Sequence, residues 1–251
     1  MLNTILNHRT IRKYKSAPIT EKDLNDILIA GTRASTTGNM QAYCMIVTKN
    51  EAIKEKLWEC HFKQELVKKA PVIITFCADY NRINKWCKQR KAEPGFDNFL
   101  SFTSAAIDAL LVAQNVAIAA EDKGLGICYL GTTTYNADKI IDILKLPKDV
   151  VPVTTLALGY PEENPGLTDR LPLKAVVHEE TYTDFSEKEI NELYFEKENL
   201  PFHLELLEIN KKETLAQIFT ELRYKKTDNL TFTKKFLKVL EKQGFMNNET
   251  E

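Results

Sequence analysis

FLSFTSAAIDALLVAQNVAIAAEDKGLGICYLG, residues 99–131, is the stretch that decides the fold. Its first part, residues 99–123, is apolar almost all round and rich in Ala and Ser, so it predicts a long helix that is buried on most of its faces. Gly124 and Gly126 are expected to end this helix. Residues 127–131 then predict a strand that leaves the core through a glycine, where backbone N–H groups can approach a ligand closely.

Three further strands are predicted around this helix, at residues 43–49, 71–79 and 152–159. The strongest signal is 71–79, PVIITFCAD, because apolar and β-branched residues fill both faces, which is typical of a central strand. Residues 173–180 are expected to close the sheet as an edge strand. Helices are predicted over 20–33, from the capping residue Asn50 to about Cys60, and from the capping residue Asn136 to about Leu144.

Beyond about residue 183 the pattern changes: strands vanish, charge rises, and helices are expected over 186–197, 212–224 and 229–243. This order of elements predicts an α+β or mixed α/β fold with a helical C-terminal extension. We therefore divide the chain into a core over residues 1–182 and an extension over residues 183–251 that packs on the core.

The composition excludes several classes of partner. The 251 residues carry 34 basic and 35 acidic side chains, a net charge of −1, whereas phosphate backbones and membrane surfaces require clustered positive charge. No uninterrupted apolar run reaches the ~18 residues of a membrane span, and the N-terminal order of apolar before basic residues reverses that of a signal peptide. Five scattered cysteines without a CxxC motif are typical of reduced thiols. We expect a cytoplasmic protein without nucleic-acid or membrane partners.

Familiar catalytic motifs are missing from the sequence. It contains neither a GxGxxG fingerprint nor a GxxxxGK[ST] loop, and no GxSxG elbow. The four histidines lie far apart and none has HxxxH or HExxH spacing, so no metal site is expected.

Polar residues next to the apolar elements are the remaining candidates. Arg9 and Arg12 share one face of a helical turn and, with Thr10, could hold a phosphate through planar guanidinium forks. Taken alone, however, these residues favour a solvated charge cluster. Arg170 lies in a proline-rich stretch that could aim it at a fixed anion, or leave it merely exposed. The loop 34–41 offers uncharged hydrogen-bonding groups for a ligand rich in hydroxyls or for the edge of a heteroaromatic ring, or is an ordinary connection.

Together these segments resemble one family, the FMN-dependent nitroreductases. HRTIRKY (8–14) with PITEKDLNDIL (18–28) resembles the family's N-terminal signature, and ASTTGNMQ (34–41) is similar to its Ser-Ser-x-Asn-x-Gln loop. The stretch 110–131 resembles its long helix and glycine turn. NPGLTDRLP (164–172) and the C-terminal helices are similar to the larger branch of oxygen-insensitive NADPH nitroreductases and flavin reductases. The resemblance covers about residues 4–245.

The resemblance implies a mostly antiparallel, mixed sheet flanked by helices in an intertwined homodimer with FMN at the interface. It implies that the FMN phosphate and ribityl chain are held by His8, Arg9, Thr10, Arg12 and Arg170. It places on the isoalloxazine, from the other subunit, Thr36, Thr37, Asn39 and Gln41. It implies that Gln64 bonds the ribityl chain or ring edge, and that the backbone lying near N5 and O4 belongs to Tyr129, Leu130, Gly131 and Thr132.

Departures from the family pattern concern the charges of the site. Thr168 stands where a phosphate-binding lysine is usual, Thr132 where a second glycine is common, and Thr134 where an arginine often lies. For the nicotinamide 2′-phosphate the chain offers Lys211 and Lys212 in place of arginines.

The implied activity is transfer of a hydride from NADPH or NADH to FMN, followed by two-electron reduction of a nitroaromatic, a quinone or free flavin. No acid–base side chain is required, so no catalytic residue is assigned. Two alternatives stay open: an FMN-storage or FMN-sensing protein without turnover, and another reduction (ene, azo or dehalogenation) on the same scaffold.

Overall fold

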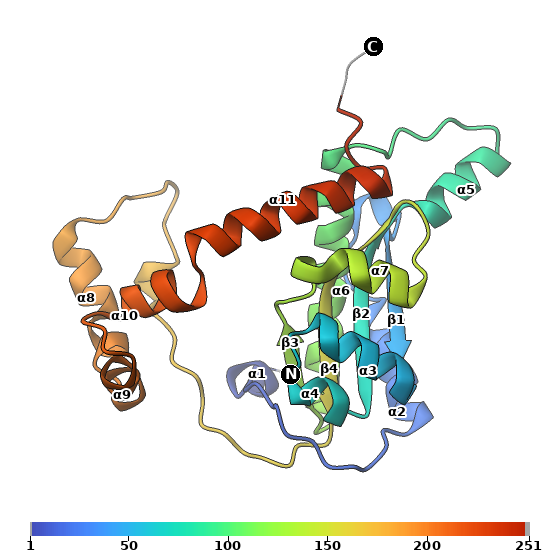
Figure 1. The fold of residues 1–251 in the computed structure, drawn as a ribbon. Coiled ribbons are helices and arrows are strands. Elements are labelled where there is room, and N and C mark those ends of the chain that lie inside the picture. Colours follow the sequence, from blue (N-terminus) through green and yellow to red (C-terminus); the bar gives the residue numbers. More distant parts are fainter. Residues whose placement is uncertain (1, 249–251) are drawn as a thin grey trace. The chain divides into compact units, whose positions relative to one another are not determined.

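A four-stranded sheet is the centre of the computed structural model, which describes residues 2–248 (Figure 1). The strands are β1 (Tyr43–Thr48), β2 (Val72–Asp79), β3 (Gly126–Leu130) and β4 (Val150–Gly159). Their order is β1-β2-β4-β3 and each neighbouring pair is antiparallel. All eight residues of β2 are buried, as the two-sided apolar pattern predicts for an interior strand. The predicted α+β fold is confirmed.

Helices cover both faces of this sheet. On one face lies α6 (Phe99–Asp122), whose Val112 and Val116 pack in one core with Ile74 and Leu156 of the sheet. The other face carries a second core formed with α3, α4 and α7 (Figure 1). The helices of this part of the chain are α1 (Leu2–Leu6), α2 (Glu21–Gly31), α3 (Glu51–Cys60), α4 (Glu65–Lys69), α5 (Asn81–Gln89), α6, α7 (Ala137–Leu144) and α11 (Lys226–Gln243), with 3-10 turns η1 (Thr37–Asn39) and η2 (Thr134–Asn136).

Helix α6 also has an apolar face that none of residues 2–248 covers fully. Among the described residues it is the one helix long and apolar enough to cross a membrane by length and composition, but its buried side packs on the sheet as a core helix does. Ile107, Leu110 and Leu111 on its other side are about half exposed. A row of exposed aliphatic side chains on a core helix indicates a protein–protein contact.

Helix capping follows the sequence with one exception. Asn50 accepts a hydrogen bond from the backbone N–H of Ile53, as predicted, and Thr20 accepts one from that of Asp23. Asn136, predicted to cap α7, makes no capping bond; its Nδ2 donates instead to the carbonyl of Cys60, 2.7 Å away. That prediction was wrong because a partner 76 residues away outcompetes the local backbone.

The chain forms two compact units, residues 1–166 with 232–251, and residues 167–231. The second unit holds η3 (Leu173–Ala175), α8 (Glu187–Glu198), α9 (Pro201–Asn210), α10 (Leu215–Gln217) and the π-helical η4 (Ile218–Arg223). The predicted edge strand at 173–180 is wrong: Pro172 precedes a 3-10 turn, and Val176 and Val177 stay exposed. The predicted boundary at residue 182 concerned a core and its extension and stays a prediction.

Candidate functional site

The end of β3 carries a buried histidine that links two of the predicted site residues. Nδ1 of His61 is hydrogen-bonded to Oγ1 of Thr132 at 2.8 Å, and Nε2 of Gln64 donates to the His61 carbonyl at 3.1 Å. The His61 side chain is fully buried, and this desolvation lowers its pKa to about 4, so the ring is neutral at pH 7. Its Nε2 is one of the few buried side-chain atoms without a partner within residues 2–248. Sequence reasoning missed His61, since a lone histidine outside any motif carries no signal.

The N-terminal signature runs beside the same strand. Thr10 forms a parallel bridge with Ile127, and the Ile11 N–H donates to the Ile127 carbonyl at 2.9 Å. The approach is close: a Cβ on Gly126 would lie 2.6 Å from Ile11, so a glycine is required at this position. The predicted phosphate-binding segment is therefore at the sheet edge that also carries the strand end 129–132.

Within this segment the structure distinguishes the charged side chains. His8 Nδ1 lies 2.7 Å from Oε1 of Glu121, and Arg9 donates to Asn164 Oδ1 at 2.6 Å. The guanidinium of Arg12 is exposed and makes no hydrogen bond or ion pair in the described part of the chain; only the backbone N–H of Arg12 is bonded, to Glu163. Arg12 and Lys13 are thus the cations of the signature whose side chains are left available for an anion, and only Arg12 offers a planar guanidinium.

A buried carboxylate holds the polar loop 34–41. Asp108 of α6 is 1% exposed and accepts from the Thr37 N–H at 2.9 Å, from the Thr37 hydroxyl at 3.3 Å and from the Ala42 N–H at 3.3 Å. Asn39 and Gln41 both adopt left-handed backbone conformations, with φ of 54° each. Side chains other than glycine rarely adopt such angles unless the surroundings enforce them. Asp108 was also missed; its signal is a lone acidic residue inside an apolar helix.

The loop and the strand end lie on different sides of the sheet. The loop leads into β1, one edge of the β1-β2-β4-β3 order, whereas 129–132 ends β3, the other edge. A single copy of the chain therefore separates two groups of predicted site residues. Arg170 belongs to the second unit, and its Nη1 donates to the carbonyls of Thr168 and Asp169 at 3.3 and 2.9 Å.

Comparison with known proteins identifies the family. The model of the nitroreductase family matches residues 5–160, which is more than half of the chain. The chain belongs to the nitroreductase family. The family predicted from the sequence is thereby confirmed.

Relatives and solved structures extend this likeness over most of the chain. FMN reductase (NADPH) of Bacillus subtilis is 35% identical over 210 residues, 79% of this chain and 84% of the relative. The oxygen-insensitive NADPH nitroreductase of Salmonella typhimurium is 34% identical over 74% of this chain and 76% of its own. A solved Bacteroides fragilis structure has a TM-score of 0.96 at 52% identity, covering 98% of this chain and all of that one. The Vibrio harveyi NADPH:FMN oxidoreductase complexed with NAD+ has a TM-score of 0.84 at 26% identity, covering 98% and 99%.

The donor set of this nitroreductase fits FMN. Arg12 supplies a guanidinium that makes no hydrogen bond or ion pair within residues 2–248, which suits a phosphate. Gly131 is exposed, and a Cβ built on it would meet nothing within 4 Å, so a flat ring can approach its backbone closely. Gln64 and Thr132 add an amide and a hydroxyl around the neutral His61.

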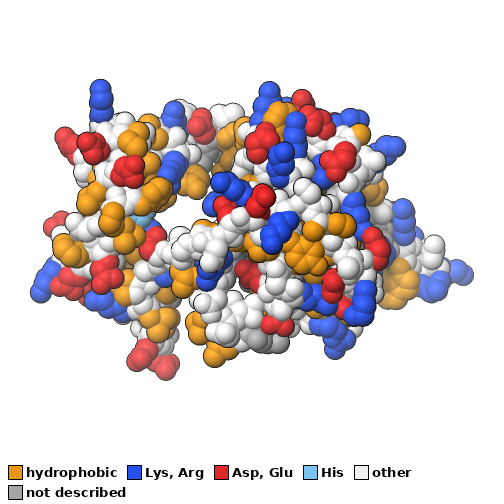
Figure 2. All heavy atoms as spheres, turned by 90° about the horizontal axis from the view of Figure 1, so that it is seen from below, with side chains coloured by type: hydrophobic (Ala, Val, Ile, Leu, Met, Phe, Trp, Pro, Cys, Tyr) orange, Lys and Arg blue, Asp and Glu red, His pale blue; other side chains and the backbone are white. Residues whose placement is uncertain are grey.

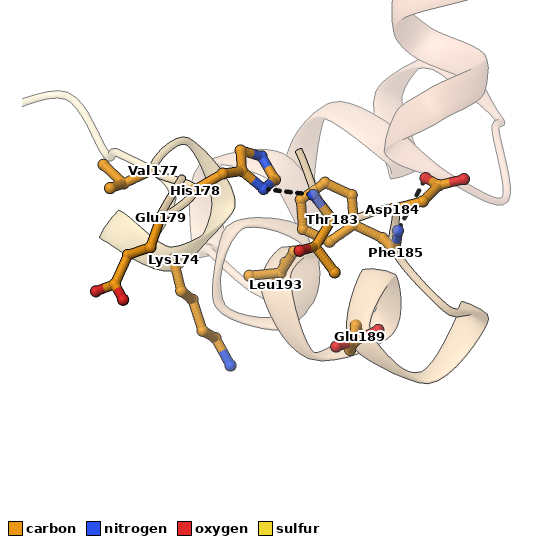
Figure 3. A pocket seen from close by; sticks show the side chains of 9 residues that line it. All are labelled: Lys174, Val177, His178, Glu179, Thr183, Asp184, Phe185, Glu189 and Leu193. Atoms are coloured by element: carbon orange, nitrogen blue, oxygen red, sulfur yellow. Dashed lines mark hydrogen bonds between the residues drawn. The ribbon is translucent and has the colours of Figure 1, made fainter. Parts of the chain in front are cut away.

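The cavities among the described residues do not bring the predicted site residues together. The cavity of about 810 Å³ in the second unit includes Arg170 and no other predicted site residue. A cavity of about 240 Å³ in the second unit is lined by His178, Phe185 and Leu193 among others, and contains none of the predicted site residues (Figure 3). There the Thr183 N–H donates to His178 Nδ1 at 3.3 Å, which closes a local turn. A cavity of about 490 Å³ includes Arg9 but also three acidic residues, Glu121, Asp122 and Glu163, which disfavour a phosphate.

Proposed function

We propose that this nitroreductase is an FMN-dependent oxidoreductase that takes a hydride from NADPH or NADH onto bound FMN and passes two electrons to an aromatic acceptor. The observation that carries the proposal is that the signature segment 8–12 pairs with the start of β3 at Ile127, while the turn 61–64 is bonded to Thr132 just past the end of the same strand. The activities in the names of the relatives, FMN reductase and NADPH nitroreductase, support it.

The residues of this chain bind and orient the flavin and transfer no protons themselves. Arg12 binds the phosphate through a bidentate, charge-assisted contact. The backbone at Gly131 and Thr132 lies along the ring and donates hydrogen bonds where negative charge develops. His61 holds Thr132 through its ring and Gln64 through its carbonyl. The resemblance also assigns Arg170 to the phosphate, and this assignment stays a prediction.

A homodimer is part of the same proposal. Thr36, Thr37, Asn39 and Gln41 are on the β1 side of the sheet, away from the β3 end, so one copy cannot supply both to one flavin. The exposed face of α6 offers Ile107, Leu110 and Leu111 as a contact for a second copy. A second chain that packs on this face would cover the apolar row and complete the site.

The finer assignments concern donor, acceptor and compartment. NADPH is the donor in the relatives' names, and Lys211 and Lys212 are the cations for its 2′-phosphate; Lys212 is already paired with Glu221 at 2.6 Å. We propose nitroaromatics, quinones or free flavin as acceptors.

A cytoplasmic location is supported by the five free cysteines. Figure 2 shows side chains of both charge signs interspersed over the visible face, without a patch of one sign for a polyanion.

The absorption spectrum of the purified protein, followed by anaerobic titration with NADPH and with NADH, tests the proposal. We expect a yellow protein whose flavin bleaches with at least one nicotinamide and recovers on addition of menadione, nitrofurazone or free FMN. A yellow protein that neither nicotinamide bleaches would be a flavin-storage protein. A colourless protein that ignores added FMN would overturn the proposal.

A further inference from the structure

Three aromatic side chains from distant parts of the chain meet beside the candidate flavin site. The rings of Tyr135 and Phe232 are stacked, with centroids 4.2 Å apart and planes 7° from parallel. Phe62 stands edge-on to both, at 6.4 Å from Tyr135 and 6.2 Å from Phe232. All three belong to the first compact unit. We call Phe62, Tyr135 and Phe232 the aromatic trio.

Polar contacts fix the trio in place. Asn136, next to Tyr135, donates to the carbonyl of Cys60, two residues before Phe62. Lys235, three residues after Phe232, donates to Asn136 Oδ1 at 3.0 Å and pairs with Asp138 at 2.8 Å. One asparagine therefore ties together the three segments that carry the rings. Rings held this way lose little conformational freedom when a ligand binds.

Phe62 has two unfavourable features: a left-handed backbone conformation and an aromatic side chain that is largely exposed to water. Its side chain is 53% exposed, so much of the ring contacts water. Its φ is 53° and that of the next residue, Lys63, is 58°. Two consecutive non-glycine residues in the left-handed region are costly, and such strain is typical of functional sites. A glycine would relieve the strain, and yet an aromatic ring stands there.

The trio is adjacent to the residues assigned to the flavin ring. His61, the neighbour of Phe62, is bonded to Thr132, and Tyr135 lies three residues after Thr132. Two cations next to the trio are engaged: Lys235 with Asp138, and Lys63 over the ring of Trp58 at 5.5 Å. The exposed ring of Phe62 offers an apolar, aromatic surface.

We propose that the aromatic trio stacks the ring of the electron acceptor and thereby selects planar aromatic acceptors over non-aromatic ones. The proposal rests on the proposed function, because it assigns the acceptor side of the same site. Ring pairs prefer offset-stacked or edge-to-face geometry, and the exposed part of Phe62 offers the ring of a ligand either arrangement.

Binding of an unreactive ring tests the trio without turnover. Calorimetry on the FMN-loaded protein compares 2-naphthoate with its saturated analogue, decahydro-2-naphthoate, which has the same charge and carbon skeleton. We expect the aromatic anion to bind about fivefold more tightly, which is about 1 kcal/mol at 1.4 kcal/mol per tenfold. Phe62→Leu and Phe62→Gly should both abolish this difference. The glycine variant relieves the backbone strain, so it keeps the fold while it removes the ring.

Steady-state kinetics supply the second arm of the test. In Phe62→Leu and Phe232→Leu we expect kcat/KM for menadione to fall about fivefold, while kcat/KM for ferricyanide, a non-aromatic acceptor, stays within twofold. Phe62→Tyr should restore the menadione value. The control is Trp86→Leu, which removes a 60% exposed ring on α5, outside the trio, and should change neither acceptor.

Two outcomes would overturn the inference: equal binding of the two naphthoates by the wild-type protein, or parallel loss of both acceptors in the trio variants. Neither outcome touches the proposed function, which fails only if the protein lacks FMN or if neither nicotinamide reduces its flavin.

Discussion

At the scale of single residues, the site depends on which side chains the fold already engages. His8 and Arg9 carry the same signature as Arg12, but their side chains contact Glu121 and Asn164. His61 lies outside the signature and is nevertheless the residue to which Gln64 and Thr132 are bonded. The chemistry of the site therefore depends on which side chains still lack a hydrogen-bond partner, as well as on the residue types.

Arg12→Ala should weaken FMN binding by about 2 kcal/mol, since it removes a charge-assisted contact to the phosphate. Arg9→Ala is the matched variant and should cost less, because Arg9 already donates to Asn164 and to the Pro165 carbonyl. Fluorescence titration of the apoprotein with FMN measures both affinities. An equal loss in the two variants would contradict the assignment of Arg12 as the phosphate-binding arginine.

His61 should make the stability of the protein pH-dependent below neutrality. Burial lowers its pKa to about 4 in the folded protein, against 6.5 for the free side chain. Between these values the unfolded chain binds more protons, so the free energy of unfolding falls as the pH drops from 6.5 to 4, by about 3 kcal/mol at most. Urea unfolding of the wild type and of His61→Gln measures this, and the difference between the two should change only in that window. Parallel profiles would show that His61 does not titrate as a buried neutral ring.

At the scale of elements, Asp108 shows how a side chain of helix α6 fixes the conformation of the distant loop 34–41. Its carboxylate satisfies backbone N–H groups on both sides of the left-handed residues Asn39 and Gln41. An unpaired buried N–H is costly, so the loop conformation and the helix position stabilise each other.

Asp108→Asn should lower the free energy of unfolding by about 2 kcal/mol, because the amide group cannot accept from both Thr37 and Ala42. We expect amide hydrogen exchange to accelerate at residues 37–42 and FMN affinity to fall. Asp142→Asn, at an exposed position of α7, is the control and should change neither quantity. Unchanged exchange at 37–42 in Asp108→Asn would show that the carboxylate does not hold the loop.

The same elements show what the sequence can predict. Strands β2 and β4 can be predicted from the sequence because both of their faces are buried. Such strands appear as continuous apolar runs, which can be recognised without knowing the tertiary contacts. The strand predicted at 173–180 has equally apolar valines, but pairing depends on a neighbouring strand, which a local pattern cannot supply. The prediction that Asn136 caps α7 is wrong for a related reason: the hydrogen-bond partner of its side chain, the carbonyl of Cys60, is distant in sequence. The site residues taken from the resemblance stay predictions. The roles of His61 and Asp108 can be recognised only from their contacts in the folded structure.

At the scale of the whole molecule, the strand order places two groups of predicted flavin-binding residues, in the loop 34–41 and at residues 129–132, at opposite edges of the sheet. The loop lies before β1 and residues 129–132 lie at the end of β3, and for this reason the proposed site includes a second copy of the chain. Ile107, Leu110 and Leu111 on α6 are the apolar row that such a copy would cover.

Leu110→Glu should therefore convert a dimer of about twice 28.7 kDa into a monomer, because a buried unpaired carboxylate at the interface is costly. Flavin should be lost with it, since the partner's loop no longer reaches the β3 end. Light scattering after size exclusion gives the mass, and the absorption spectrum gives the FMN content. Ile53→Glu, at a partly exposed position of α3 on the opposite face of the sheet, is the control and should stay dimeric and yellow. A monomeric Leu110→Glu variant that retains its flavin would show that one chain completes the site alone, and the loop 34–41 would then need a different role.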